Sequence, residues 1–276
     1  MSDDRQLQSA LRRLEKICAE RPELQQLGQI NAALLKVLFR SAHQSSPLAP
    51  REESGIANRS NFATPQFRTT PPPIDASALK HNWLDVCSIL SQNAELEPAR
   101  RLADAVTSRM FDPAEQQLAV LSHGTEPFRS VLHDLELDEP LGITILRLSS
   151  LPQLAPIAWQ YDPQIRAARW DGDHCPLCGG EPLLAELRGL EQLRWLRCGW
   201  CATQWQVDRL YCPFCNQRDH QHLHDLFLEG QAQGPRLATC DTCSRSLPTL
   251  ATLDALTAPG LLVAEMETLH LRFLGE

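Results

Sequence analysis

Eight of the ten cysteines fall in the C-terminal half of the chain, and their spacing is its strongest chemical signal. They form four Cys-x-x-Cys turns, here called knuckles: Cys175/Cys178, Cys198/Cys201, Cys212/Cys215 and Cys240/Cys243. One knuckle brings two thiolates within reach of a metal ion, and two knuckles complete a tetrahedral four-sulfur site. The sequence therefore predicts that all eight thiolates are metal ligands.

The gaps between the knuckles predict which of them share a metal. Nineteen residues separate the first knuckle from the second and twenty-four separate the third from the fourth, whereas only ten lie between the second and third. The two longer gaps leave room for a short hairpin. We therefore expect the first knuckle to join the second and the third to join the fourth, which gives two metal modules in tandem.

An internal repeat supports this pairing. The opening knuckles read CPLCG from Cys175 and CPFCN from Cys212, which lie 37 residues apart, and the closing knuckles begin 42 residues apart. A period of this length indicates duplication of one small unit. Gly179 and Asn216 directly follow the two opening knuckles, where we expect the turn to need a positive φ, which these residue types tolerate best.

The residues around the first two knuckles read as β-strands. Residues 181–188 and 193–197 flank a turn at Gly189, and residues 204–211 lead into the second module. We expect the nearby tryptophans, at positions 195, 200 and 205, to cover the metal sulfurs and to fill a very small core. A stacking platform for nucleic acid is the alternative for these rings.

The charge distribution argues against nucleic acid. The formal net charge is −8, and residues 171–247 carry ten acidic residues against seven arginines before any metal is counted. Affinity for a phosphate backbone comes mainly from clustered basic side chains. We therefore expect no nucleic-acid partner. His220, His222 and His224 alternate near a strand, and we expect exposed side chains rather than a third metal site, because one strand cannot supply converging ligands.

The N-terminal part must position these modules, and it reads as helix. Apolar residues recur at helical spacing through residues 5–20, where Cys18 packs as a small hydrophobe, and the next helix starts near Pro22. Asp75 and Asp112 are plausible N-caps of later helices. Cys87 is expected in the core, like Cys18.

Two apolar segments leave alternatives open. Residues 141–159 contain prolines at 152 and 156, and they predict one buried helix broken at Leu151, two short helices, or a strand around 143–145. Residues 253–269 predict a helix that packs on the body, interrupted at Pro259-Gly260. Residues 44–73 are rich in Ser, Pro, Thr and charge, which favours an irregular surface segment.

These patterns predict an α+β protein in three parts. Residues 1–170 form a helical N-terminal domain, 171–210 the first cysteine module, and 211–276 the second module with a C-terminal helix. No apolar run approaches the roughly 20 residues of a membrane span, and no secretory signal follows Arg12-Arg13. We therefore expect a cytoplasmic protein that is not integral to a membrane, where thiols stay available to metal rather than forming disulfides. The helical part shows no catalytic motif, so we expect no enzyme.

The cysteine region resembles the FdhE family of formate dehydrogenase accessory proteins. The matching segments are CPLCGGEP (175–182), LRWLRC (193–198), CATQW (201–205) and Arg209 ahead of the third knuckle, and the likeness is looser before Asp171. The resemblance implies two rubredoxin-like iron sites and a partner, the catalytic subunit of respiratory formate dehydrogenases, whose maturation the protein would support in the cytoplasm like a chaperone. It also implies that the chain is not itself a dehydrogenase.

Other interpretations remain open. Four thiolates suit zinc as well as iron, so iron rests on the resemblance alone. A zinc-ribbon adaptor with a different client would share every ligand, and an electron-transfer protein would share the rubredoxin-like sites. A thiol–disulfide enzyme would use one knuckle as a redox pair, but no thioredoxin-like strand-then-helix pattern surrounds any of the four.

Overall fold

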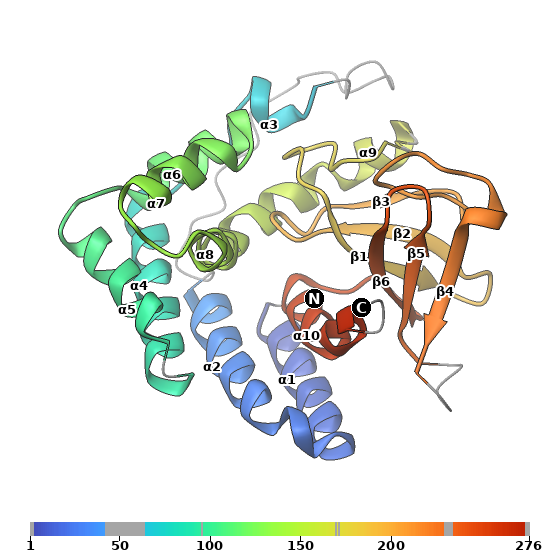
Figure 1. The fold of residues 1–276 in the computed structure, drawn as a ribbon, viewed down its shortest axis with the longest axis horizontal. Helices are drawn as coiled ribbons and strands as arrows, with labels where there is room; N and C mark the ends of the chain where they lie inside the picture. The colour runs from blue at the N-terminus through green and yellow to red at the C-terminus, as the bar shows by residue number, and fades with distance from the viewer. Residues whose placement is uncertain are drawn as a thin grey trace.

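The helical region and the sheet of the molecule lie side by side (Figure 1), as seen in a computed structural model of the chain. It describes residues 3–41, 64–94, 96–168, 170, 172–228 and 234–273. The helices are α1 (Asp3–Glu20), α2 (Gln25–Ser41), α3 (Gln66–Thr69), α4 (Ala76–Asn93), α5 (Glu97–Thr107), α6 (Pro113–His123), α7 (Glu126–Asp134), α8 (Glu139–Gln160), α9 (Asp162–Ala168) and α10 (Ala258–Thr268), with short 3-10 turns η1 (Pro22–Leu24), η4 (His220–His222) and η5 (Leu269–Phe273). The strands are β1 (Pro182–Arg188), β2 (Leu193–Cys198), β3 (Gln204–Gln206), β4 (Leu223–Phe227), β5 (Arg236–Cys240) and β6 (Arg245–Thr252). The predicted α+β class is confirmed.

Local sequence signals set several helix starts. The Asp75 carboxylate accepts a hydrogen bond from the backbone N–H of Ala78 at 3.0 Å and caps α4, and Asp112 caps α6 through Ala114 at 2.7 Å. Such a cap satisfies one of the N–H groups that a helix start leaves without a partner. Both predicted N-caps are therefore confirmed.

Helix α8 is the central helix of the helical region and runs unbroken through Pro152 and Pro156. Each proline removes a backbone hydrogen bond and costs roughly 3 kcal/mol or more in a helix interior. Burial of Leu151 and Leu154, both 0% exposed, offsets that cost, and the side-chain amide of Asn82 donates to the Ser149 carbonyl at 3.0 Å, within the turn that Pro152 weakens.

Among the described residues, α8 is the one helix long and apolar enough to cross a membrane by length and composition. However, 61% of its apolar window is buried inside this fold. The helix packs against α4, α2 and α7, as the core helix of a globular domain does.

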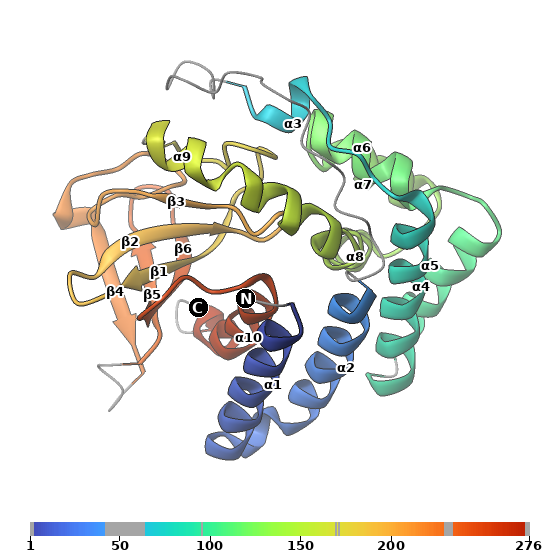
Figure 2. The same ribbon diagram turned by 180° about the vertical axis from the view of Figure 1, so that it is seen from behind.

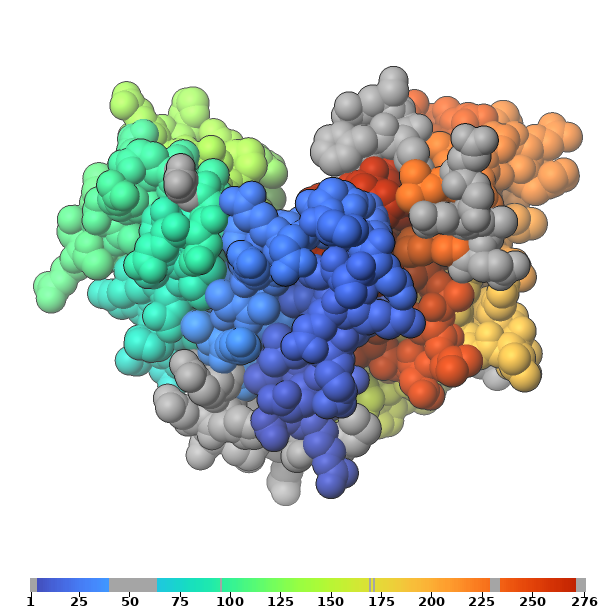
Figure 3. All heavy atoms as spheres, turned by 90° about the horizontal axis from the view of Figure 1, so that it is seen from below, coloured from blue at the N-terminus to red at the C-terminus, as the bar shows by residue number. Residues whose placement is uncertain are grey.

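Helix α10, near the C-terminal end of the described residues, lies against the first two helices of the chain. It packs on α1 and α2, and Figure 3 shows the N-terminal helices against the C-terminal segment. Pro259 and Gly260 do not interrupt this helix as predicted, because they lie in its first turn, where the Thr257 hydroxyl accepts from the Gly260 N–H at 3.3 Å. Proline is tolerated there because the N–H that it lacks would have had no helical partner.

The two cysteine modules form one six-stranded sheet in the order β3-β2-β1-β6-β5-β4. Each module contributes three antiparallel strands, and the two halves join through the parallel pair β1 and β6, from Ala185 opposite Thr249 to Arg188 opposite Thr252. Strands β1, β2 and β3 correspond to β4, β5 and β6, so the duplicated unit is repeated by translation along the sheet. The predicted strand 204–211 is shorter than expected and ends at Gln206.

A buried ion network fixes the joint between the modules. Glu186 of β1 is 0% exposed and accepts hydrogen bonds from the guanidinium groups of Arg197 and Arg188, the Thr252 hydroxyl and the Leu256 backbone N–H. Burial opposes ionisation of this carboxyl, but the two arginines outweigh it and lower its pKa below the ordinary value. The carboxylate therefore stays charged and holds β1, β2 and β6 together.

The boundaries at residues 170 and 210 stay a prediction. The sheet is continuous across residue 210, and α10 belongs to the helical core formed with α1 and α2. Most of the irregular segment predicted at 44–73 lies outside the described residues, and its described end forms α3.

Candidate metal centres

The first and second knuckles converge on one point, here called the first centre. The sulfurs of Cys175 and Cys201 lie 3.6 Å apart, those of Cys178 and Cys198 3.3 Å, and those of Cys178 and Cys201 3.6 Å. A tetrahedron with metal–sulfur bonds of about 2.3 Å has sulfur–sulfur edges of about 3.8 Å. The four sulfurs are therefore spaced to hold a single ion.

The third and fourth knuckles form the second centre in the same way. The sulfurs of Cys212 and Cys243 lie 3.7 Å apart and those of Cys215 and Cys240 3.6 Å. All sulfurs within each centre lie within 4.8 Å of one another, so the knuckles group as their gap lengths predict. Ligation of metal by these eight thiolates stays a prediction that this geometry fits.

Each knuckle ends in a residue with positive φ. The angle is +75° at Gly179 and +62° at Asn216, as predicted, and it is +58° at Ala202 and +54° at Ser244 after the closing knuckles. Gly179 and Asn216 each donate their backbone N–H to the carbonyl of the first cysteine of their knuckle, at 2.9 and 3.0 Å. This turn aims both sulfurs of a knuckle to the same side.

The first centre is fully buried, and this burial affects the ionisation of its thiols. Its four cysteines are at most 6% exposed. Contact with the neighbouring thiols, together with burial, raises the pKa of Cys178 well above its ordinary value, and burial does the same for the pKa of Cys201. Burial opposes ionisation of Cys175, but hydrogen bonds from the neighbouring thiols outweigh it and lower the pKa of Cys175 well below its ordinary value. A bound metal ion would compensate the charge of all four thiolates together. The Thr203 hydroxyl lies 2.9 Å from the Cys201 sulfur, where it can donate to a thiolate.

The second centre is partly open to solvent. Cys212 and Cys240 are buried, whereas Cys215 and Cys243 are half-buried. Burial raises the pKa of Cys212 to about 12. Burial also opposes ionisation of Cys240, but backbone N–H groups of its own knuckle and the neighbouring thiols lower that pKa to about 7. Backbone donors therefore stabilise the thiolate form of Cys240, whereas burial raises the pKa of Cys243.

The tryptophans divide into two roles. Trp205 is 1% exposed and shares a core with the sulfurs of the first centre, and the ring of Trp200 lies over Gly180 of the first knuckle. Trp195 instead lies between the guanidinium groups of Arg166 and Arg188, at 4.9 and 4.8 Å from its ring centre. The predicted covering role therefore applies to Trp200 and Trp205 and is wrong for Trp195.

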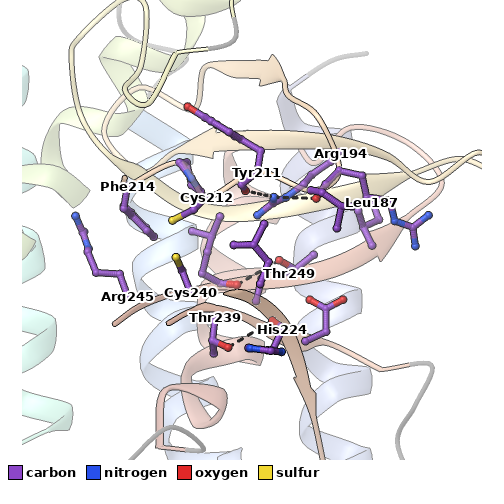
Figure 4. Close-up of a pocket in the computed structure, with 17 residues that line it drawn as sticks. Leu187, Arg194, Tyr211, Cys212, Phe214, His224, Thr239, Cys240, Arg245 and Thr249 are labelled. Carbon is purple, nitrogen blue, oxygen red and sulfur yellow. Dashed lines mark hydrogen bonds between the residues drawn. The ribbon is translucent and has the colours of Figure 1, made fainter. Parts of the chain in front are cut away.

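Arg194 links the two modules, and sequence reasoning gave it no role. This side chain is 7% exposed, and its Nη1 donates to the backbone carbonyls of Tyr211 at 2.5 Å and Arg209 at 3.2 Å (Figure 4). Burial lowers its pKa, and the negative groups of Asp225 and Cys212 oppose that shift. Its only sequence signal is an arginine between the apolar residues Leu193 and Trp195 of β2.

Segment α3 supports the first knuckle from the helical side. The backbone N–H groups of Gln66 and Phe67 donate to the carbonyls of Pro176 and Leu177 at 3.0 and 2.7 Å, and the Phe67 ring is 1% exposed. The short contact depends on residues more than a hundred positions apart. The surrounding sequence carries no periodic pattern from which to predict it.

The three histidines are exposed and the two remaining cysteines are buried, as the sequence predicts. Among the described residues, no further group of Cys, His, Asp and Glu side chains has metal-binding spacing. His220, His222 and His224 are exposed, and His224 contacts Asp241 at 2.8 Å. Cys18 and Cys87 are buried in the helical core.

Comparisons with known proteins point to one family. The family model described as "FdhE, central domain" matches residues 174–209, which contain the first centre. The chain is 34% identical over 132 residues to "Protein FdhE homolog" of Stutzerimonas stutzeri, covering 46% of this chain and 42% of that protein. It is 28% identical over 184 residues to "Protein FdhE" of Salmonella dublin, covering 65% of this chain and 57% of that protein. The chain thus spans about half the length of these curated relatives.

The fold has a counterpart of known structure. The crystal structure of the FdhE protein from Pseudomonas aeruginosa superposes with a TM-score of 0.62, covering 100% of this chain and 92% of that chain at 19% identity. Fold and sites together define a protein with a helical N-terminal part and two tandem rubredoxin-like or zinc-ribbon-like modules. In sequence and in fold, the chain is thus similar to FdhE proteins, and the comparisons support the FdhE family.

Proposed function

We propose that this chain is an accessory factor for formate dehydrogenase. It binds the catalytic subunit of a respiratory formate dehydrogenase in the cytoplasm and supports its maturation without turning over a small molecule itself. The observation that carries the proposal is the match of the FdhE central domain to residues 174–209, the segment that builds the first centre.

The chemistry of the centres supports a holding role. Each centre offers four thiolates and therefore fills all four positions of a tetrahedral ion, which leaves none open for a substrate. A bound metal would supply folding energy to modules whose own cores are small. Iron is the metal we propose for both centres, because the family resemblance implies it; zinc fits the same donors.

A deletion strain tests the role directly. We expect it to accumulate inactive formate dehydrogenase with nearly normal subunit abundance, and plasmid-borne wild-type chain to restore activity. A reciprocal pull-down should recover the catalytic subunit from cytoplasmic extract. Full activity in the deletion strain together with no association in the pull-down would contradict the proposal and favour a zinc-ribbon adaptor with another client.

A further inference from the structure

Residues of the first three knuckles line one cleft of about 460 Å³. The elements around it, α3, α6, α7 and α8 on one side and the sheet on the other, are drawn in Figure 2. The first knuckle contributes Cys178, the second Trp200 and the third Phe214, and Arg245 lies two residues after the last cysteine of the fourth. The cleft is therefore lined by parts of both metal modules. A molecule in this cleft would contact both modules at once.

The cleft is rich in arginine. Its lining includes Arg68 from α3, Arg129 from α7, Arg147 from α8 and Arg245 from β6, and a single carboxylate, that of Glu181. This balance is the reverse of the whole chain, which carries a net charge of −8. A cleft lined by positive side chains attracts anionic groups, even in a protein whose net charge is negative.

Two of these arginines are committed to the fold. Arg147 makes two hydrogen bonds to Glu265 of α10, at 2.8 and 3.0 Å. Arg245 makes two to Glu181, at 2.7 and 2.5 Å, and its guanidinium lies 3.7 Å from the ring centre of Phe214. Paired guanidinium groups held in this way form fixed walls.

The other two arginines are available to a ligand. Arg68 is exposed and, among the described residues, has no carboxylate within ion-pair distance. Arg129 is 41% exposed, and the nearest carboxylate oxygens, of Glu126 and Glu139, lie at 3.6 and 3.8 Å. Exposed ion pairs at such distances contribute little to stability. A carboxylate of a bound ligand can therefore take the place of Glu126 or Glu139 beside Arg129.

Two glycines let the walls of the cleft pack closely. A Cβ added to Gly179 would lie 2.9 Å from the Pro65 ring, and one added to Gly180 would lie 3.0 Å from the Trp200 ring, so neither position has room for a side chain. The rings of Trp200 and Phe214 are half-buried and line the cleft. Aromatic faces and exposed guanidinium groups together suit a polypeptide that carries carboxylates.

We propose that this cleft is the docking site for an acidic polypeptide segment of the client protein. The inference rests on the proposed function for the identity of the client and names the chemistry by which it is recognised. Asp and Glu side chains of the segment pair with Arg68 and Arg129, and its apolar groups contact Trp200 and Phe214. A segment docked there contacts both metal modules and the helical region. Its affinity therefore depends on how these parts are placed relative to one another.

Charge reversal at the available arginines tests the proposal. The variant Arg68→Glu/Arg129→Glu is compared with Arg5→Glu/Arg100→Glu, which makes the same change of net charge at exposed positions that do not line the cleft. Both variants should keep the metal content and thermal midpoint of the wild type. Binding to the purified catalytic subunit is then measured at low and high ionic strength.

We expect the cleft variant to bind the catalytic subunit more weakly by on the order of tenfold, and the control to stay within about twofold of the wild type. Wild-type affinity should fall as salt rises. Equal binding by the wild type and the cleft variant would overturn the cleft proposal while leaving the proposed function intact.

A second probe separates the two proposals further. A fluorescein-labelled glutamate-rich peptide is titrated with each protein, and binding is followed by fluorescence anisotropy. Binding to the wild type and control, with loss in the cleft variant, supports the cleft even if the catalytic subunit fails to bind and the proposed function falls. Equal peptide binding by all three proteins would contradict an acidic-segment site.

Discussion

The two metal centres share ligands and local turns but differ in their surroundings. The first is buried in the core that joins the sheet to α8 and α9, with all four cysteines at most 6% exposed. The second lies toward the outer end of the sheet, with Cys215 and Cys243 half-buried and the guanidinium groups of Arg194 and Arg245 nearby. Duplication of one unit has therefore produced an inner centre tied to the whole fold and an outer centre tied mainly to its own strands.

The largest difference should follow from removing one ligand of each centre. Cys175→Ser should empty the first centre and cost several kcal/mol of folding free energy, because metal binding and folding of this module are coupled. Cys243→Ser should empty only the second centre and leave the inner core folded. Metal content per chain and thermal unfolding followed by circular dichroism check both outcomes, and equal destabilisation by the two changes would remove the proposed asymmetry.

The joint between the modules gives the next largest effect. Glu186→Gln should destabilise the protein by about 3–5 kcal/mol, because it leaves the buried guanidinium of Arg197 without its charge partner. Exposed Glu191→Gln on the neighbouring turn is the matched control and should be nearly neutral. Urea denaturation at neutral pH measures both.

The same carboxyl predicts the direction of an acid effect. The folded pKa of Glu186 is lowered, so its stabilising contribution is complete above the unfolded value of about 4.3 and is lost as pH falls through the folded pKa. The stability difference between wild type and Glu186→Gln should therefore shrink below about pH 4. A difference that stays constant through that range would show that the carboxylate charge does not matter.

A chelator should remove the metal from the two centres at different rates. The outer centre should lose its metal faster by on the order of tenfold, which corresponds to about 1.4 kcal/mol less opening free energy. Residues of the outer module should lose hydrogen-exchange protection first, while the helical part keeps its circular dichroism. Simultaneous release from both centres would show that they open as one unit.

The smallest effect concerns the closing turns. Ala202→Gly should stabilise the protein by about 0.5–1 kcal/mol, because alanine is strained at φ +58° and glycine is not. Ser244→Gly makes the same test in the outer module at φ +54°. A loss of stability in both variants would show that side-chain contacts outweigh backbone strain there.

Short-range features of this fold could be predicted from sequence. The aspartates that cap α4 and α6, the sequential grouping of the knuckles and the positive φ at Gly179 and Asn216 each depend on a few neighbouring residues. Such signals are local steric and hydrogen-bonding preferences, which act wherever the segment lies in the fold.

Long-range features could not be predicted in this way. The parallel pairing of β1 with β6 joins residues 64 apart, and the continuity of α8 through Pro152 depends on burial that overrides the local preference against proline. The outer module was expected to contain a short hairpin, but the bounds of its strands could not be predicted, because β4 has a mainly exposed side-chain pattern with no clear alternation. In each case distant packing decided the structure.

The central claim is that each group of four cysteines binds one metal ion. Anomalous X-ray scattering from crystals of protein purified anaerobically without added metal tests it most directly. We expect two peaks per chain, each about 2.3 Å from four cysteine sulfurs, and we expect their signal to rise at the iron absorption edge. A signal that rises at the zinc absorption edge instead would identify the bound metal as zinc, held by the same ligands. An ion shared between knuckles of different centres, or no ion at either centre, would contradict the account.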